Sequence, residues 1–126
     1  MARDDYFVIV YKILQYFYEC MKAGKRPMAE DIQPSCQMFS IPEAYWTSIM
    51  DELIDRGYLK GVYKVPGMQM GAGYKITCSA AITMAGAEFL EENSRMHKAR
   101  DFLGEEFRSV LAGIVAQLPA VMMSMM

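Results

Sequence analysis

The stretch from Ser40 to Gly61 constrains the fold more than any other, because it reads as one complete helix that runs directly into a strand. Ser40, three residues before Glu43, predicts a capping box, and a proline between them suits the first turn. Gly57 predicts the helix stop, since glycine readily adopts a positive φ. The apolar side chains share one face at helical spacing and are expected to be buried: Tyr45, Trp46, Ile49, Met50 and Leu53.

Length and composition limit the classes of protein to which the chain can belong. Its 126 residues suffice for one domain with its own core, and 53% hydrophobic against 22% charged residues indicates a globular chain. A net charge of −2 weighs mildly against a nucleic-acid-binding role. Three dispersed cysteines and one histidine predict no disulfide framework, metal site or cofactor, and favour the cytoplasm. The first residues do not resemble a signal peptide.

Helical patterns occupy most of the region before Ser40. A first helix is expected from Asp4 or Asp5 to Ala23, with Gly24 as its stop. It is apolar on several sides, which predicts that more than one neighbour covers it. A brief strand at Pro27–Met28 and one short helix within Ala29–Phe39 are expected next. Together with the following helix, that short helix is a helix-turn-helix candidate.

A β-hairpin is predicted after Gly57. Residues 58–65 and 74–79 are rich in strand formers, and the glycine-rich segment 66–73 joins them. That segment matches no phosphate-binding fingerprint, so it is interpreted as the tip of the hairpin. Thr83 is then expected to cap another helix, in which Gly86 permits close approach to a neighbour.

The end of the chain carries a long apolar stripe. Ser94 is expected to cap a helix from about Arg95 to Leu118, and the tail 121–126 is expected to fray or to be bound by a partner. Residues 109–126 are uncharged and approach the length of about 20 residues that spans a bilayer. Because the apolar residues concentrate on one stripe, burial against the first helix of this chain or of a partner is favoured over a membrane anchor. The candidate dimerisation residues are Leu103, Phe107, Val110, Leu111, Ile114 and Leu118.

The order of these elements is that of a winged helix, and several motifs carry a closer resemblance. They are Ala29-Glu30-Asp31-Ile32, the run from Leu53 to Val62, Ile82-Thr83-x-x-Gly86-x-x-Phe89-Leu90, and Glu92-Asn93-Ser94-x-Met96-x-Lys98-Ala99. From Tyr11 to about Leu103 the chain resembles the YjcQ family of bacteria and their phages, and more distantly the MarR and PadR regulators. The resemblance implies a mainly α winged helix-turn-helix domain with a small β-hairpin over residues 1–93. A long C-terminal helix is added over 94–126, and pairing through terminal helices implies a homodimer.

A winged helix would present its third helix to DNA, yet this one is acidic. Residues 40–56 hold four acids and one base, and carboxylates repel phosphate. The hairpin segment 57–80 has no acid, and its candidate nucleic-acid-binding residues are Lys60, Lys64 and Lys75. Thr47 and Ser48 are candidates for base contacts. The leading hypothesis is therefore a cytoplasmic, dimeric DNA-binding transcription regulator of a phage or mobile-element locus.

Two other functions stay open at this point. The acidic helix and the methionines Met68 and Met70 in the hairpin tip fit a protein-interaction module without DNA binding. A ligand sensor is the other option, with a pocket among aromatic residues: Tyr6, Phe7, Tyr11 and Trp46. No enzyme is predicted, because the single imidazole, His97, lies in a charged stretch and the paired glutamates diverge along their helices.

Overall fold

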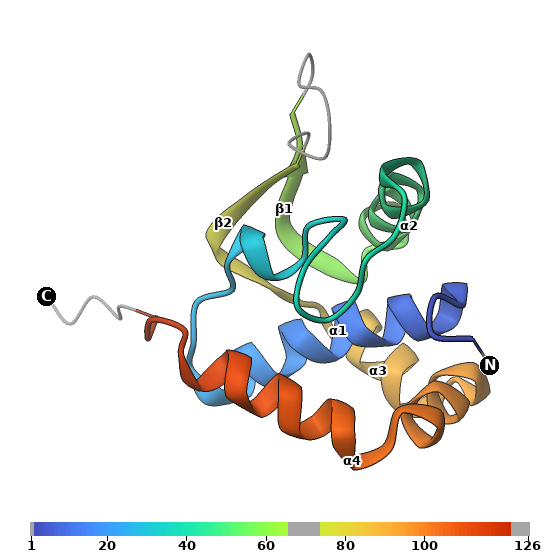
Figure 1. Cartoon of the computed structure of the whole chain (residues 1–126). Helices are drawn as coiled ribbons and strands as arrows, with labels where there is room; N and C mark the ends of the chain where they lie inside the picture. The colour runs from blue at the N-terminus through green and yellow to red at the C-terminus, as the bar shows by residue number, and fades with distance from the viewer. Residues whose placement is uncertain (1, 66–73, 122–126) are drawn as a thin grey trace, which may run out of the picture.

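The computed structural model describes residues 2–65 and 74–121. A helix lies across the middle of the molecule, with the hairpin and the second helix on one side and two further helices on the other (Figure 1). The elements in chain order are α1 (Tyr6–Ala23), a 3-10 turn (Ala29–Asp31), α2 (Glu43–Asp55), β1 (Leu59–Lys64), β2 (Tyr74–Ile82), α3 (Met84–Glu92) and α4 (Ser94–Ala116).

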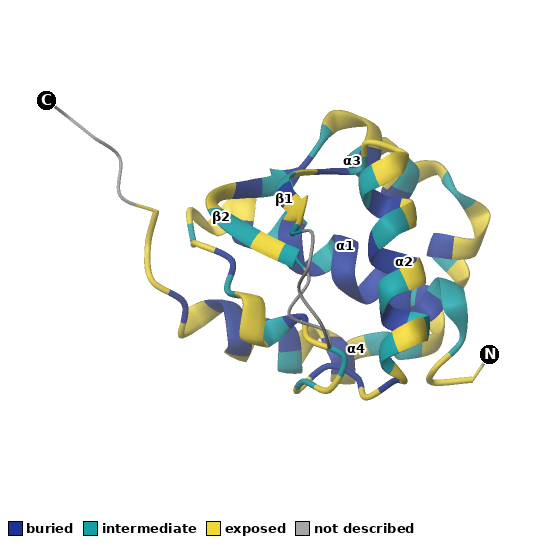
Figure 2. Ribbon diagram, turned by 90° about the horizontal axis from the view of Figure 1, so that it is seen from above, coloured by how far each residue is buried: buried dark blue, intermediate teal, exposed yellow. Residues whose placement is uncertain are grey.

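Helix α1 is the centre of the core, and its predicted ends are confirmed. The Asp5 carboxylate accepts a hydrogen bond from the Phe7 N–H at 2.9 Å, and Gly24 ends the helix at φ 68°. Contacts with α3, α4 and β2 cover the helix on several sides, as its apolar surface predicted. Ten of the 18 residues of α1 are buried, most of them in the middle of the helix, and Figure 2 shows the labelled part of α1 in dark blue.

The short helix predicted within Ala29–Phe39 is confined to a 3-10 helix at Ala29–Asp31, and the strand predicted at Pro27–Met28 is wrong. Polar groups of residues 28–32 form hydrogen bonds with side chains of α1 and α2. The buried Tyr16 hydroxyl donates to the Asp31 carboxylate at 2.7 Å and accepts from the Met28 N–H at 2.9 Å. The Trp46 indole N–H donates to the Ile32 carbonyl at 2.7 Å. These bonds anchor residues 28–32, and a bridge between Ser35 and Ser40 lies within the irregular segment that follows.

The predicted capping box of α2 is also wrong, although the rest of that helix is confirmed. Ser40 forms a bridge with Ser35 instead, and Pro42 occupies the cap position without a side-chain hydrogen bond. Trp46 is only 3% exposed, and the helix buries its predicted apolar face. Gly57 follows at φ 72°, which confirms the predicted stop and turns the chain into β1.

The two strands pair antiparallel as predicted, with an irregularity in the middle. Leu59 lies opposite Ile82, whereas Val62 lies opposite Ile76, so β2 contributes extra residues between these pairs. Gly61 sits at this bulge with φ 75°, and the Thr77 hydroxyl donates to its carbonyl at 2.8 Å. Within the irregular part of β2, Cys78 is exposed, although alternation would place it on the same face as Ile76.

Two features of the last two helices differ from the prediction: the residue that caps α4, and a break within α4. Thr83 caps α3 as predicted, since its hydroxyl accepts from the Gly86 N–H at 3.1 Å. Asn93, rather than Ser94, caps α4 through two N–H groups of the first turn. Gly104 has φ 63° and ψ −154°, which breaks the predicted continuous helix into two segments (Figure 1). The helical spacing of apolar residues continues across the break and therefore concealed it.

The apolar stripe of α4 packs within its own chain. Four of the six candidate dimerisation residues are buried, and the Phe107 ring lies 6.0 Å from that of Tyr11 on α1. Leu103 and Val110 are half-buried. After α4, the Val121 N–H donates to the Gly24 carbonyl at 2.8 Å, so the described start of the expected frayed tail is anchored to the end of α1. A homodimer stays a prediction, and an interface through this stripe would have to use residues of the monomer core.

Candidate nucleic-acid interface

The β-hairpin presents two chemically different faces. Residues directly opposite each other on antiparallel strands project to the same side, and successive residues project to opposite sides. Leu59 with Ile82, and Val62 with Ile76, therefore mark the inner face that packs on the core. The alternate pairs, Lys60 with Ala81 and Tyr63 with Lys75, mark the outer face.

The inner face connects the hairpin to α2 through Tyr74. Its ring meets the Trp46 ring edge-on at 5.1 Å between centroids, and its hydroxyl donates to the Asp51 carboxylate. Burial and that carboxylate raise the pKa of Tyr74, so the phenol stays protonated. Lys64, opposite Tyr74, forms an ion pair with the same carboxylate at 3.5 Å. Thus one of the three predicted wing lysines is already paired with an acid.

The outer face combines two lysines with an exposed aromatic ring. Tyr63 is 59% exposed, and its partner Lys75 lies directly across the ladder, where side chains are about 5 Å apart. Because the bulge at Gly61 reverses the alternation, Lys60 stands on the same face as Tyr63, roughly 10 Å along the strand. The ion pairs among the described residues include neither Lys60 nor Lys75. Both ammonium groups are therefore available to an external anion.

A third cation, Lys25 at the C-terminal end of α1, lies near the part of the hairpin that carries Lys60. Lys25 and Ala81 line the same shallow cavity of about 310 Å³, and Ala81 is the ladder partner of Lys60. The Lys25 ammonium donates to the Leu118 carbonyl at 3.1 Å, which leaves its charge without a carboxylate partner among the described residues. Residues 25, 60, 63 and 75 are called the wing strip below.

Helix α2 offers little to a nucleic acid. Ser48 is exposed, but Thr47 is half-buried and its carbonyl accepts a hydrogen bond from Tyr74 at 3.4 Å. The exposed surface around Ser48 carries Glu52 and Asp55. Arg56 is held by Glu52 at 2.7 Å. The structure therefore separates the predicted site residues, with the hydroxyls on an acidic helix and two lysines on the wing strip.

Tyr63 is the residue that sequence reasoning missed. Strict alternation along β1 predicts that Tyr63 shares a face with the buried Leu59, so the sequence alone favours its burial. The irregularity between Lys60 and Val62 reverses the alternation and leaves Tyr63 exposed. Its pairing with Lys75 required the register, which the bulge shifts and the sequence does not reveal.

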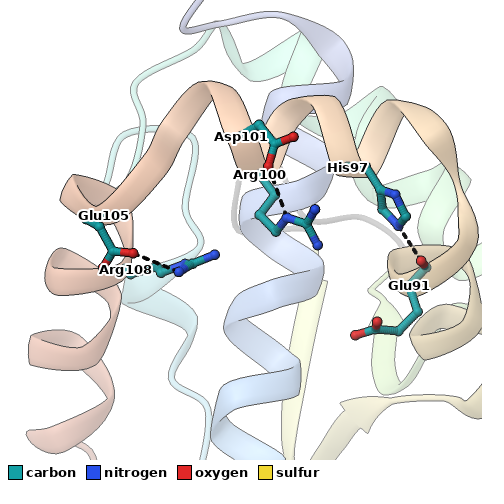
Figure 3. A network of polar contacts seen from close by, with 6 residues as sticks. All are labelled: Glu91, His97, Arg100, Asp101, Glu105 and Arg108. Carbon is teal, nitrogen blue, oxygen red and sulfur yellow. Dashed lines mark hydrogen bonds and ion pairs between the residues drawn. The ribbon is translucent and has the colours of Figure 1, made fainter.

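The charged groups of α3 and α4 make local contacts, which Figure 3 shows. The His97 ring contacts the backbone carbonyl of Glu91 across the turn between the helices. Arg108 pairs with Glu105 at 2.8 Å, and Arg100 lies 3.3 Å from Asp101. These contacts stabilise the turn and the helix surface, and they bring no carboxylate to the imidazole within the described residues.

The proposed aromatic pocket does not form from its four predicted residues. Trp46 packs on Tyr74, Tyr11 on Phe107, and Tyr6 on Phe7, so the rings belong to separate parts of the core. The larger cavity in the described structure is lined by none of the four. Among the helices of the described residues, none has the length and hydrophobicity needed to cross a membrane.

The fold identifies the class of the protein, and the match to a family model identifies its family. A mainly helical chain with a two-stranded antiparallel wing and an added C-terminal helix is a winged-helix protein. The family model described as YjcQ protein matches residues 11–105, and the chain belongs to the YjcQ family. This confirms the resemblance predicted for Tyr11 to about Leu103. Searches of curated proteins and of solved structures gave no match.

Proposed function

We propose that this protein is a DNA-binding transcription regulator that contacts duplex DNA through its wing strip, in a phage or mobile-element setting. The observation that carries the proposal is an exposed tyrosine flanked by two lysines that have no ion pair among the described residues. Lysine side chains supply phosphate contacts, and the major groove of B-DNA admits a two-stranded ribbon. A hairpin can therefore enter the duplex while the acidic α2 stays away from it.

The mode of binding follows from the distribution of charge. The few available cations predict modest affinity without marked sequence preference, and a shallow slope of log K against log salt of about −0.9 for each phosphate contacted. A two-fold homodimer would double the wing strip, and sedimentation analysis in the presence and absence of DNA tests that expectation. Dimerisation would then raise the affinity through two linked contacts.

Charge reversal tests the proposal. We expect Lys60→Glu and Lys75→Glu each to weaken duplex binding in fluorescence anisotropy, and each to reduce the slope of log K against log salt by about one. Lys98→Glu on α4 makes the same change in net charge outside the wing strip and should leave the slope unchanged. Lys64→Glu should have a smaller effect than Lys60→Glu, because Lys64 is already paired with Asp51.

The alternative function is a protein-interaction module that presents the exposed acidic surface of α2. The observation that favours it is that Glu52 and Asp55 are exposed on the same helix as the exposed Ser48. A basic protein partner would bind there, and its binding would be weakened by Glu52→Lys and not by Lys60→Glu. Binding of duplex DNA that is equally strong in wild type and in the Lys60→Glu and Lys75→Glu variants would exclude the wing-strip proposal.

A further inference from the structure

A second feature of the molecule lies outside the wing. A cavity of about 570 Å³ opens between α1, the loop 36–41 and α4, within the size range of small-molecule sites. Two of the departures from the predicted fold border it. The loop takes the place of the predicted short helix, and residues on either side of the Gly104 break line its wall. Regular helices at these two places would not leave the same space.

The cavity wall contains a buried cation. Lys12 of α1 is only 8% exposed, and it is the one buried charged side chain among the described residues. Its ammonium donates to the Met38 carbonyl at 2.7 Å and lies 5.7 Å from the centre of the Phe107 ring. An ammonium has three N–H donors, and no carboxylate lies within ion-pair distance of this one in the described chain.

A buried charge without a counter-ion is unfavourable, and burial indeed lowers the pKa of Lys12. An anion in the cavity would satisfy the remaining donors. The other residues that line the cavity determine the size and the charge of the anion that would fit. Phe107, Val110 and the 44%-exposed Phe102 offer apolar surface. Asp4 and Glu106 at the same cavity would repel a doubly charged group more strongly than a single carboxylate.

We propose that this cavity binds a small organic carboxylate, with its carboxylate on the Lys12 ammonium and its aromatic or aliphatic body against Phe107 and Phe102. The site uses none of the wing-strip residues. It would therefore bind its ligand in the absence of DNA, and its test does not depend on the proposed function.

The first test compares two ligands of nearly equal shape on the full chain. We expect 3-phenylpropionate to raise the melting temperature and to shift the amide resonances of Lys12, Met38 and Phe107. The neutral 3-phenylpropanamide should bind about tenfold or more weakly, because it lacks the charge-assisted hydrogen bond. Equal binding of acid and amide, or shifts centred elsewhere on the chain, would overturn the proposal. Failure of 3-phenylpropionate, benzoate and hexanoate all to bind at about 10 mM would do the same.

The second test removes the cation. Lys12→Met keeps a long apolar stem and should bind 3-phenylpropionate no better than the amide. The control Lys22→Met makes the same substitution on an exposed turn of α1 and should bind the carboxylate as wild type does. Undiminished carboxylate binding by a folded Lys12→Met protein would refute the proposed role of Lys12. If that variant does not fold, the acid–amide comparison on the wild-type protein decides the matter.

Discussion

Gly61 controls the register of the wing, and replacing it with alanine should destabilise the protein in a calculable way. Its φ of 75° lies in the left-handed region, which alanine adopts at a cost of about 1–2 kcal/mol. A Cβ atom built there would lie 2.7 Å from the Ala80 Cα and 2.9 Å from the Ala80 nitrogen. Backbone atoms cannot rotate aside as a side chain can, so β2 would have to move.

Crowding of this kind costs about 1–3 kcal/mol, and with the backbone strain the total loss is about 2–5 kcal/mol. A loss of about 3 kcal/mol lowers the melting temperature of a domain of this size by roughly 10 °C. The matched control is Gly113→Ala in α4, where a Cβ would meet nothing within 4 Å. That variant should gain about 0.5–1 kcal/mol, because alanine restricts the unfolded chain more than glycine does.

Urea unfolding followed by fluorescence is a suitable assay, since Trp46 is the single tryptophan and is buried beside Tyr74. The midpoint should fall for Gly61→Ala and rise for Gly113→Ala, with similar m-values. A Gly61→Ala protein that is as stable as wild type, or more stable, would refute the description of the bulge as a close backbone contact.

Three further predictions concern the core. Lys12→Met should be as stable as wild type or more so at pH 7, because it removes a buried charge. Since the folded-state pKa of Lys12 is lowered, the unfolded chain binds more protons, so this advantage should shrink as the pH rises toward about 10.4 in calorimetric scans. Phe107→Ala should cost about 3–5 kcal/mol in urea unfolding, and the cost should be the same at all protein concentrations because the ring packs on Tyr11 in the same chain; a cost that grows with concentration would contradict this. Tyr74→Phe should cost about 1 kcal/mol and free the Asp51 carboxylate, whereas an unchanged midpoint would argue against that hydrogen bond.

Much of the fold could be predicted because local rules and tertiary packing agree. The Asp5 and Thr83 caps and the Gly24 and Gly57 stops depend on interactions within a few residues. At Gly86 the prediction from the sequence also agrees with a contact between residues that are distant in sequence. A Cβ there would lie 2.4 Å from the Tyr58 carbonyl, so the small residue is required by the contact that its smallness predicted.

The rest depends on partners that are distant in sequence. Residues 29–39 form only one turn because Tyr16 and Trp46 bind the polar groups of Asp31 and Ile32. The break at Gly104 interrupts no apolar period, so only the backbone dihedrals reveal it. Likewise the lysines of the wing could be found from composition, but the division between paired Lys64 and the unpaired outer face follows from the register of β1 and β2.

The most direct measurement is an amide chemical-shift titration of the labelled protein with a short DNA duplex at low salt. The account predicts that the largest shifts occur at Lys60, Tyr63 and Lys75 and diminish as salt is added. Largest shifts on α2 around Ser48 and Glu52, or no shifts at saturating DNA, would contradict it.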